Sequence, residues 1–247
     1  MKFSWIGLLP TFVQKSIFSF TGLESRVLPF HVKNGSTWLA YEITRPEKIQ
    51  SKLPPHLKLS DISVFQEPPK PVLFFNFFQV DSIFFQGHRL EFVTVAQHQH
   101  TGKFHFVILD YLSDAISSDP NHIFRDPTRS HMQLNYQSDY HYCEIQNEFF
   151  VLGAHLHNQS SFPTINPQFS VECNEEIYYG SSVEQTPNKL WFSEKETSHV
   201  LPFFPVVLKN PFYTSIRKSD PFVAFYYPND IVFSILMGKQ PDHDFEI

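Results

Sequence analysis

Cysteine and glycine are scarce in this sequence of 247 residues. With only Cys143 and Cys173, the chain cannot form a multi-disulfide scaffold or a zinc site of the CxxC type. We expect both thiols to be free and reduced; the alternative is that the two cysteines pair with each other. The 8 glycines are few for a β-rich protein, so its turns must rely on Pro, Asn, Asp and Ser.

Long apolar runs and clusters of basic residues are also lacking. No stretch approaches the roughly 20 apolar residues that a membrane-spanning helix needs. The formal net charge is −6 and no group of Lys and Arg stands out, which argues against nucleic acid as the main partner. The apolar start is interrupted by Pro10 and lacks a small-residue cleavage site, unlike a signal peptide. We therefore expect a cytoplasmic protein with no membrane or nucleic-acid partner.

Aromatic residues are abundant instead. The chain has 28 Phe and 10 Tyr but only 3 Met. Each buried ring removes roughly 150–250 Å² from water, so these rings must dominate the core, and aromatic residues favour strands. The 19 Pro disfavour long helices. The composition indicates a single β-rich domain over residues 31–247, preceded by an N-terminal arm over residues 1–30 with one short helix around residues 12–20.

The first half of the chain gives the clearest local signals. Residues 38–44 are predicted as a strand, and residues 45–53 as a helix with Thr44 as its N-cap. Residues 71–80 form a nearly continuous apolar run, which is typical of a strand buried on both faces. Asn76 interrupts this run, so we interpret it as a hydrogen-bonded core amide or as a group that lines a cavity.

A hairpin is predicted next, with strands over residues 90–100 and 103–111 joined by Thr101–Gly102. A two-residue turn at this point places His98 opposite His105. Because side chains alternate along a strand, one face of the hairpin is expected to carry Glu91, Val93, Val95, Phe106, Ile108 and Asp110.

The rest of the chain reads as short strands. Residues 112–116 are predicted as a short turn of helix, and residues 117–129 as a polar loop. Later strands are expected at residues 132–136, 140–146, 149–157, 168–173, 189–192 and 222–227. Many strands at short spacing around a few short helices predict a mainly β fold, either a barrel or a sandwich.

The order of these segments resembles the acetoacetate decarboxylase-like family. The resemblance rests on residues 44–57, with Leu53-Pro54-Pro55-His56-Leu57 at the helix exit, on the buried strand 72–80, on Leu90-Glu91 at the start of the hairpin, and on residues 111–115, 123–129 and 201–206. It implies a closed or partly closed β-barrel with a few short helices. Members of the family often form oligomers, so a homo-oligomer is expected as well.

The family's chemistry is only partly retained in this sequence. A lysine of the family forms a Schiff base with a β-keto acid, beside a second lysine that lowers its pKa. The resemblance places Thr128 and Arg129 at these two positions, and neither side chain can form an imine. It also places Ile43 where the family has a substrate-binding arginine and Asn76 at one of two cavity glutamates. Glu91 retains the other.

The first functional hypothesis is a divergent, lyase-like enzyme without a Schiff base. Glu91 in a phenylalanine-walled cavity would have a raised pKa and could serve as a general acid or base. Thr128 would face the reacting centre, and Arg129 would hold a substrate carboxylate through a bidentate contact. The competing interpretation is that Glu91 and Arg129 simply pair with each other, because buried carboxylates usually need a partner.

The second hypothesis is a non-catalytic barrel that binds a more apolar ligand. With Ile43 and Asn76 replacing charged groups, the pocket would be lined by Phe74, Phe106 and Phe124, unless these rings fill the space entirely. The first hypothesis implies a small carbonyl or carboxylate ligand, the second a more apolar one, and neither requires a cofactor.

A metal site is the third hypothesis. His98, His100 and His105 share one face of the predicted hairpin and could supply a three-histidine zinc site. That face lies opposite Glu91, and the chain has 13 histidines, so we favour chance clustering and expect no metal.

Overall fold

A computed structural model describes most of the chain. The described residues are 9–21, 27–81, 85–114, 116–117, 128–129, 131–137, 140–146, 151–157, 164–165, 170, 173–179, 188–191, 198–201, 207–227 and 231–236. Among them, strands dominate and the helices are short, as the composition predicts.

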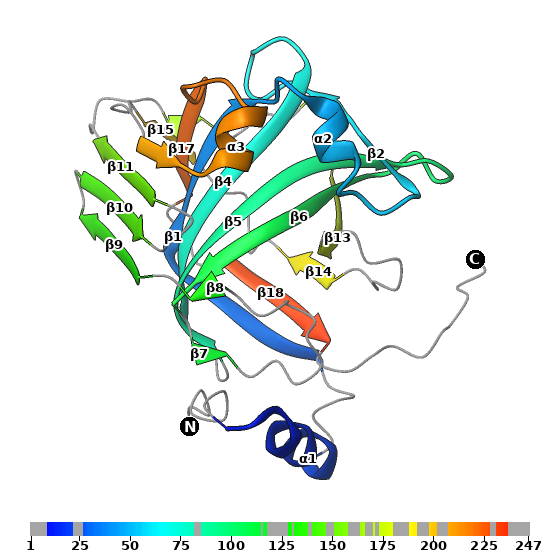
Figure 1. Ribbon diagram of the computed structural model, residues 1–247, viewed down its shortest axis with the longest axis vertical. Helices are drawn as coiled ribbons and strands as arrows, with labels where there is room; N and C mark the ends of the chain where they lie inside the picture. Colours follow the sequence, from blue (N-terminus) through cyan, green and yellow to red (C-terminus); the bar gives the residue numbers. More distant parts are fainter. Residues whose placement is uncertain are drawn as a thin grey trace.

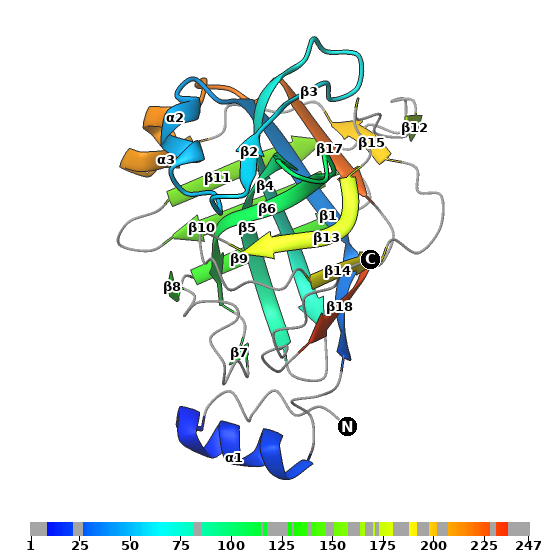
Figure 2. The same cartoon turned by 90° about the vertical axis from the view of Figure 1, so that its right-hand side faces the viewer.

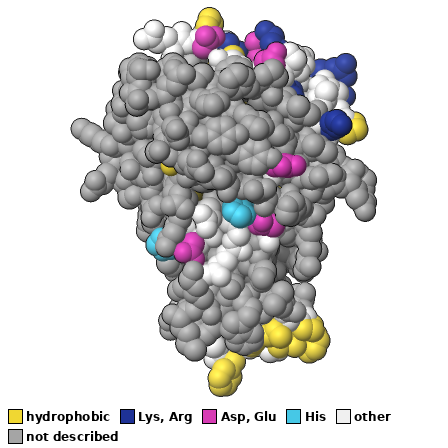
Figure 3. All heavy atoms as spheres, turned by 90° about the vertical axis from the view of Figure 1, so that its left-hand side faces the viewer, with side chains coloured by type: hydrophobic (Ala, Val, Ile, Leu, Met, Phe, Trp, Pro, Cys, Tyr) yellow, Lys and Arg dark blue, Asp and Glu magenta, His cyan; other side chains and the backbone are white. Residues whose placement is uncertain are grey.

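The described helices are α1 (Thr11–Thr21), α2 (Pro46–Gln50) and α3 (Pro211–Ile216). The predicted helix around residues 12–20 is confirmed as α1, and the helix predicted over residues 45–53 is confirmed but shorter. Its N-cap is Arg45, which forms no capping hydrogen bond, so the prediction of Thr44 as the N-cap is wrong. In Figure 1, α2 and α3 lie near one end of the molecule and α1 lies at the other. Hydrophobic side chains gather at the α1 end (Figure 3), where Phe12 and Phe20 are 71% and 94% exposed.

Two sheets contain the described strands. The 14-stranded sheet comprises β1 (Val27–Glu42), β2 (Leu57–Leu59), β3 (Asp61–Ile62), β4 (Lys70–Asp81), β5 (Phe85–His98), β6 (Phe104–Ser113), β7 (Ile116–Ser117), β8 (Thr128–Arg129), β12 (Thr164–Ile165), β13 (Cys173–Tyr179), β14 (Asn188–Trp191), β15 (Ser198–Leu201), β17 (Val223–Tyr227) and β18 (Ile231–Leu236). The 4-stranded sheet comprises β9 (His131–Gln137), β10 (Tyr140–Gln146), β11 (Val151–His157) and β16 (Val207–Lys209).

The larger sheet curls back toward itself. Pairing runs from β4 through β5, β6, β13, β14 and β18 to β1, and β1 also pairs with β4. The link between β13 and β14 is thin, with two described residue pairs, Glu176–Lys189 and Ile177–Asn188. The result is a mainly antiparallel, partly closed barrel (Figures 1 and 2), which confirms the predicted fold class.

Both faces of β4 and β5 are buried, so the sheet has two apolar layers. One layer, here called the helix face, packs against α2 and α3 and includes Leu39, Tyr41, Phe75, Phe77, Leu90, Phe92, Ile49, Tyr213 and Ile216. The other layer, here called the Glu91 face, includes Ala40, Phe74, Phe78, Val93, Val95, Phe106, Tyr111 and Phe225. The nearly continuous apolar run of β4 supplies side chains to both layers. Each fully buried phenylalanine stabilises the folded state by about 1.5–3 kcal/mol.

The hairpin differs from its prediction in two respects. The turn is longer than two residues: the His98 amide donates to the Lys103 carbonyl, and His105 pairs with Ala96 instead of His98. Gly102 lies in this turn at a φ of 70°, a conformation that favours glycine. This shift by two residues leaves the predicted faces unchanged.

A β-bulge at Leu109 changes the face of the following residues. Val93 pairs with Ile108 but Phe92 pairs with Asp110, so Leu109 is the extra residue on β6. The bulge turns Asp110 toward the helix face, and the prediction that Asp110 shares the face of Glu91 is wrong.

Other local predictions also need correction. Residues 112–113 continue β6 and residues 116–117 form β7, so the helical turn predicted over residues 112–116 is wrong. The sequence does not predict α3 or the strands β2, β3, β8, β12, β15, β16 and β18, and the strand predicted over residues 168–173 meets the described strand β13 only at Cys173. The signal for α3 was present, because Asn210 precedes Pro211 and its side chain accepts a hydrogen bond from the Tyr213 amide at 3.0 Å.

Candidate functional site

A row of partnered residues crosses five neighbouring strands of the Glu91 face. Tyr111 on β6 pairs with Glu91 on β5, and Glu91 pairs with Asn76 on β4. Asn76 pairs in turn with Trp38 on β1, and Trp38 pairs with Phe225 on β17. Directly paired residues have Cβ atoms about 4.5–5.5 Å apart, so the register alone brings these side chains into contact range.

Glu91 forms a buried ion pair within this row. Its side chain is buried, and its Oε1 lies 2.7 Å from Nε of Arg89, which is buried as well. Arg89 and Glu91 are two residues apart on one strand, so they share a face. The guanidinium carbon of Arg89 lies 3.9 Å from the centre of the Tyr111 ring, which adds a cation–π contact to the ion pair.

The surroundings of Glu91 act on its acidity in opposite directions. Burial raises the pKa of Glu91, because a carboxylate loses its hydration there. The positive charge of Arg89 and hydrogen bonds from Arg89 and Asn76 lower this pKa, and the net direction is upward. A carboxyl group with a raised pKa can exchange protons closer to neutral pH than an exposed one.

Aromatic rings surround the other end of the row. The Trp38 ring stacks on Phe225 at 5.9 Å between centroids and meets Phe74 edge-on at 5.6 Å and Phe106 at 6.2 Å. Phe74 and Phe106, both predicted to line a pocket, therefore lie on the Glu91 face and pack against Trp38.

The other predicted residues are placed less uniformly. Ile43 is buried in the helix-face layer, so the structure does not bring it to Glu91. The backbone of β8 pairs in parallel with β6, so that Thr128 partners Leu112 and Arg129 partners Ser113. The two predicted catalytic positions thus lie on the strand next to β6, close to the row in backbone register. Phe124 lies outside the described residues.

Arg89 is the charged residue of the row's surroundings that the sequence analysis does not single out, and Trp38, Tyr111 and Phe225 of the row are not predicted either. The sequence predicts Arg129 as a possible partner of Glu91, whereas the described partner is Arg89. The signal was the spacing Arg89-x-Glu91 inside a predicted strand, which places both side chains on one face.

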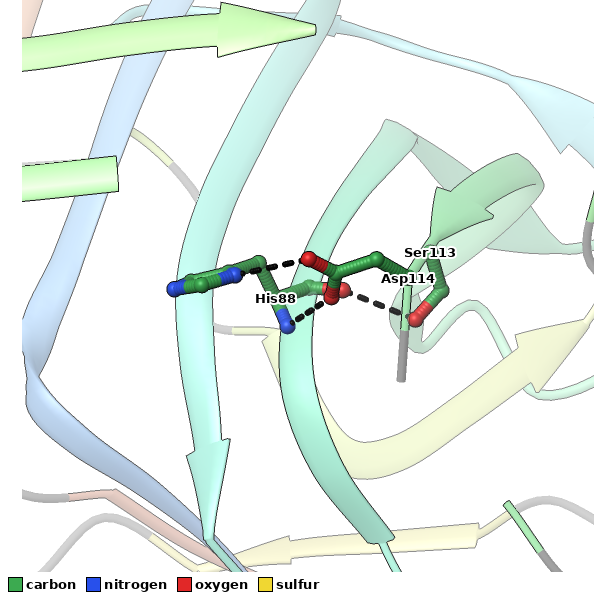
Figure 4. Close-up of polar contacts among 3 residues, drawn as sticks. All are labelled: His88, Ser113 and Asp114. Carbon is green, nitrogen blue, oxygen red and sulfur yellow. Dashed lines mark hydrogen bonds and ion pairs between the residues drawn. The ribbon is translucent and has the colours of Figure 1, made fainter. Parts of the chain in front are cut away.

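A second polar group ties the start of β5 to the end of β6 (Figure 4). Nδ1 of His88 lies 2.9 Å from the Asp114 carboxylate, which also accepts a hydrogen bond from the His88 amide. The Ser113 hydroxyl donates to the His88 carbonyl at 2.8 Å. Because this hydroxyl is directed to the backbone and not to the imidazole, the trio is arranged as a strand clamp, unlike a nucleophilic triad.

The histidines near the hairpin turn form a cluster of rings. The ring of His98 lies 5.0 Å from His56, 5.8 Å from His100 and 6.3 Å from His105. Nδ1 of His98 accepts contacts from the amides of His100 and Thr101, both at 3.2 Å, so this nitrogen is not directed to a metal. Among the described residues, no three His, Cys, Asp or Glu side chains are grouped closely enough to hold a metal ion.

Arg217 is a buried arginine on the helix face. Its guanidinium carbon lies 4.2 Å from the centre of the Tyr41 ring, and its backbone forms an isolated bridge with Ile43. One terminal nitrogen donates to the carbonyls of Lys218 and Ser219. Burial raises the pKa of Tyr41, and the positive charge of Arg217 partly opposes this shift.

The thiol of Cys173 is free, and burial raises its pKa to about 12.

No helix within the described ranges has the length and apolar character needed to cross a membrane.

Comparison with solved structures identifies the fold. An acetoacetate decarboxylase from Legionella pneumophila aligns with a TM-score of 0.53 at 15% identity, covering 83% of this chain and 84% of that one. Another acetoacetate decarboxylase aligns with a TM-score of 0.57 at 9% identity, covering 85% and 89%. The enduracididine biosynthesis enzyme MppR, complexed with the condensation product of pyruvate and imidazole 4-carboxaldehyde, aligns with a TM-score of 0.53 at 7% identity, covering 87% and 91%. No protein-family model and no curated protein sequence matches the chain. The chain therefore has the acetoacetate decarboxylase-like fold.

Proposed function

Starting from this shared fold, we propose that the chain binds a small keto acid or related carbonyl compound on the Glu91 face. In this proposal Glu91 is the general acid and base, and no Schiff base forms. The observation that carries it is the buried carboxyl of Glu91, held by Arg89 and Asn76 in a layer of aromatic side chains with its pKa raised.

The proposed chemistry is proton transfer next to a carbonyl. Glu91 accepts the proton from the carbon beside the keto group, the C–H electron pair forms a C=C bond, and the π pair of the C=O bond moves onto oxygen to give an enolate. Glu91 then returns the proton to carbon, or to that oxygen to give the enol. Arg129 holds the carboxylate of a keto acid, and Thr128 supplies a hydroxyl where relatives with Schiff-base chemistry supply an amine. The bound pyruvate condensation product in MppR supports a keto compound as the ligand class.

Replacing Glu91 by Gln tests the proposal. Keto acids are first screened by thermal shift, and turnover of those that bind is then measured. We expect Glu91→Gln to lower kcat about 10²–10⁴-fold, the usual contribution of a general acid–base, and to change Kd only a few-fold. Borohydride treatment in the presence of ligand should leave the protein mass unchanged, since no imine forms.

Glu42→Gln is the matched control. Glu42 lies on β1 of the same sheet, where its carboxylate pairs with Lys218 at 2.7 Å in a solvent-accessible position. This variant should keep full turnover. Undiminished turnover in Glu91→Gln, or a borohydride-trapped adduct, would contradict the mechanism. Ligand binding without any turnover in the parent protein would favour the non-catalytic barrel.

A further inference from the structure

The amide of Asn76 has a fixed orientation in the row. Asn76 is 3% exposed, and its side chain hydrogen-bonds to Glu91. This hydrogen bond lowers the pKa of Glu91, so it is donated to the carboxylate and the NH₂ group of Asn76 faces Glu91. Its carbonyl oxygen, Oδ1, then points away from Glu91, and no described residue donates a hydrogen bond to it.

The neighbour on the other side of Asn76 does not satisfy this oxygen. Trp38 is the next residue of the row, and the N–H of its indole ring donates to the Ser36 hydroxyl at 2.9 Å. An indole ring carries a single polar hydrogen, so this contact uses the donor of Trp38. A buried acceptor without a partner costs about 1–3 kcal/mol, which an incoming donor would recover.

We infer that the ligand of the Glu91 face carries a hydroxyl or N–H group that donates to Oδ1 of Asn76. This inference rests on the proposed function and narrows its ligand class. The keto and carboxylate oxygens of a simple keto acid are acceptors only, so they leave Oδ1 unsatisfied. A keto compound with a hydroxyl or amino substituent beside the carbonyl supplies the donor while its carbonyl remains available to Glu91.

The expected selectivity follows from the cost of the unpaired acceptor. A site built to bind a hydroxyl discriminates against an analogue that lacks it, because the buried protein group is then left without a partner. The range of about 1–3 kcal/mol corresponds to roughly 5–150-fold in Kd. Desolvation of the ligand hydroxyl offsets part of this gain, so we expect about tenfold.

Hydroxypyruvate and 2-oxobutyrate form a matched pair of probes. They differ by a hydroxyl in place of a methyl group and share the keto acid. Isothermal titration calorimetry should give a Kd about tenfold lower for hydroxypyruvate than for 2-oxobutyrate. Asn76→Leu should remove this preference, because leucine has no acceptor.

Gln79→Leu is the control variant. Gln79 lies on the same strand as Asn76, three residues on, so its amide belongs to the helix face. This variant should keep the preference. Equal affinity of the parent protein for both probes would overturn the inference and leave the proposed function standing, as would a preference that persists in Asn76→Leu. Binding of neither probe would count against the proposed function and against this inference together.

Discussion

Arg89 and Arg217 are buried on opposite faces of one sheet, and each lies over a tyrosine ring. Arg89 is 4% exposed and lies 3.9 Å from the Tyr111 ring centre; Arg217 is 8% exposed and lies 4.2 Å from that of Tyr41. Their polar partners differ. Arg89 contacts the carboxylate of Glu91, whereas Arg217 donates to the carbonyls of its own loop.

The difference shows that the partner of a buried arginine decides whether its contacts depend on pH. Backbone carbonyls do not titrate, so the contacts of Arg217 fix the loop after α3 whatever the pH. The partner of Arg89 can gain or lose a proton, so protonation of Glu91 and the ion pair are coupled. The Glu91 face is therefore expected to respond to pH and to small carbonyl ligands, and the helix face is expected to serve as a support.

Removing Arg89 should cause the largest loss in the free energy of unfolding. Arg89→Met leaves the buried carboxylate of Glu91 without its cation, and breaking a buried pair in this way costs about 3–5 kcal/mol. Urea unfolding at pH 7 measures this loss. The double variant Arg89→Met, Glu91→Leu should recover most of it, because no lone buried charge remains. A double variant as unstable as the single one would show that the charge of Glu91 is not the cause.

Removing Arg217 should cost less. Arg217→Met loses a cation–π contact and hydrogen bonds to carbonyls, so we expect a loss of about 1–3 kcal/mol. The carboxylate that attracts Arg217, that of Asp220, is exposed, so no buried charge is left unpaired. The same urea titration tests this value. If Arg217→Met were as damaging as Arg89→Met, the proposed distinction between the two faces would fail.

Replacing Glu91 itself should change the free energy of unfolding least at any single pH. Its pKa is raised on folding from an ordinary value of 4.5, so between 4.5 and the folded value the native state binds more protons than the unfolded chain. The contribution of Glu91 to the free energy of unfolding is therefore complete at low pH and is lost as the pH rises through that window.

Glu91→Gln removes this dependence. The stability difference between variant and parent should shift in favour of the variant as the pH is raised above about 4.5. Parallel unfolding curves across pH 4 to 8 measure the shift. His56, whose pKa is lowered by burial and by His98 and His100, is common to both proteins, so its contribution cancels. A stability difference that stays constant with pH would refute the raised pKa of Glu91 in the folded state.

Local patterns in the sequence predicted the elements that carry the site. The nearly continuous apolar run marks β4, and alternation after Leu90 marks β5 with Glu91 on the face of Val93 and Val95. The position of Asn76 inside that run predicted a hydrogen-bonded core amide or a cavity-lining group, and the structure adds that it pairs with Glu91.

Features that depend on distant parts of the chain escaped prediction. β1 pairs with β4, β17 and β18, and contacts between segments so far apart leave no periodic pattern in the sequence. The bulge at Leu109 depends on one extra residue in β6, which periodicity alone does not reveal. Arg89 was within reach of the sequence, because its spacing from Glu91 was visible and its meaning was overlooked.

The extra residue at Leu109 has an electrostatic consequence. In an unbroken β6, Asp110 would point to the face of Glu91 and Tyr111 would point away from it. Two carboxylates would then compete for the single guanidinium of Arg89, which would also lose the ring beneath it. One inserted backbone unit thus sorts an acidic and an aromatic side chain to opposite sides, and leaves Glu91 with a cation of its own.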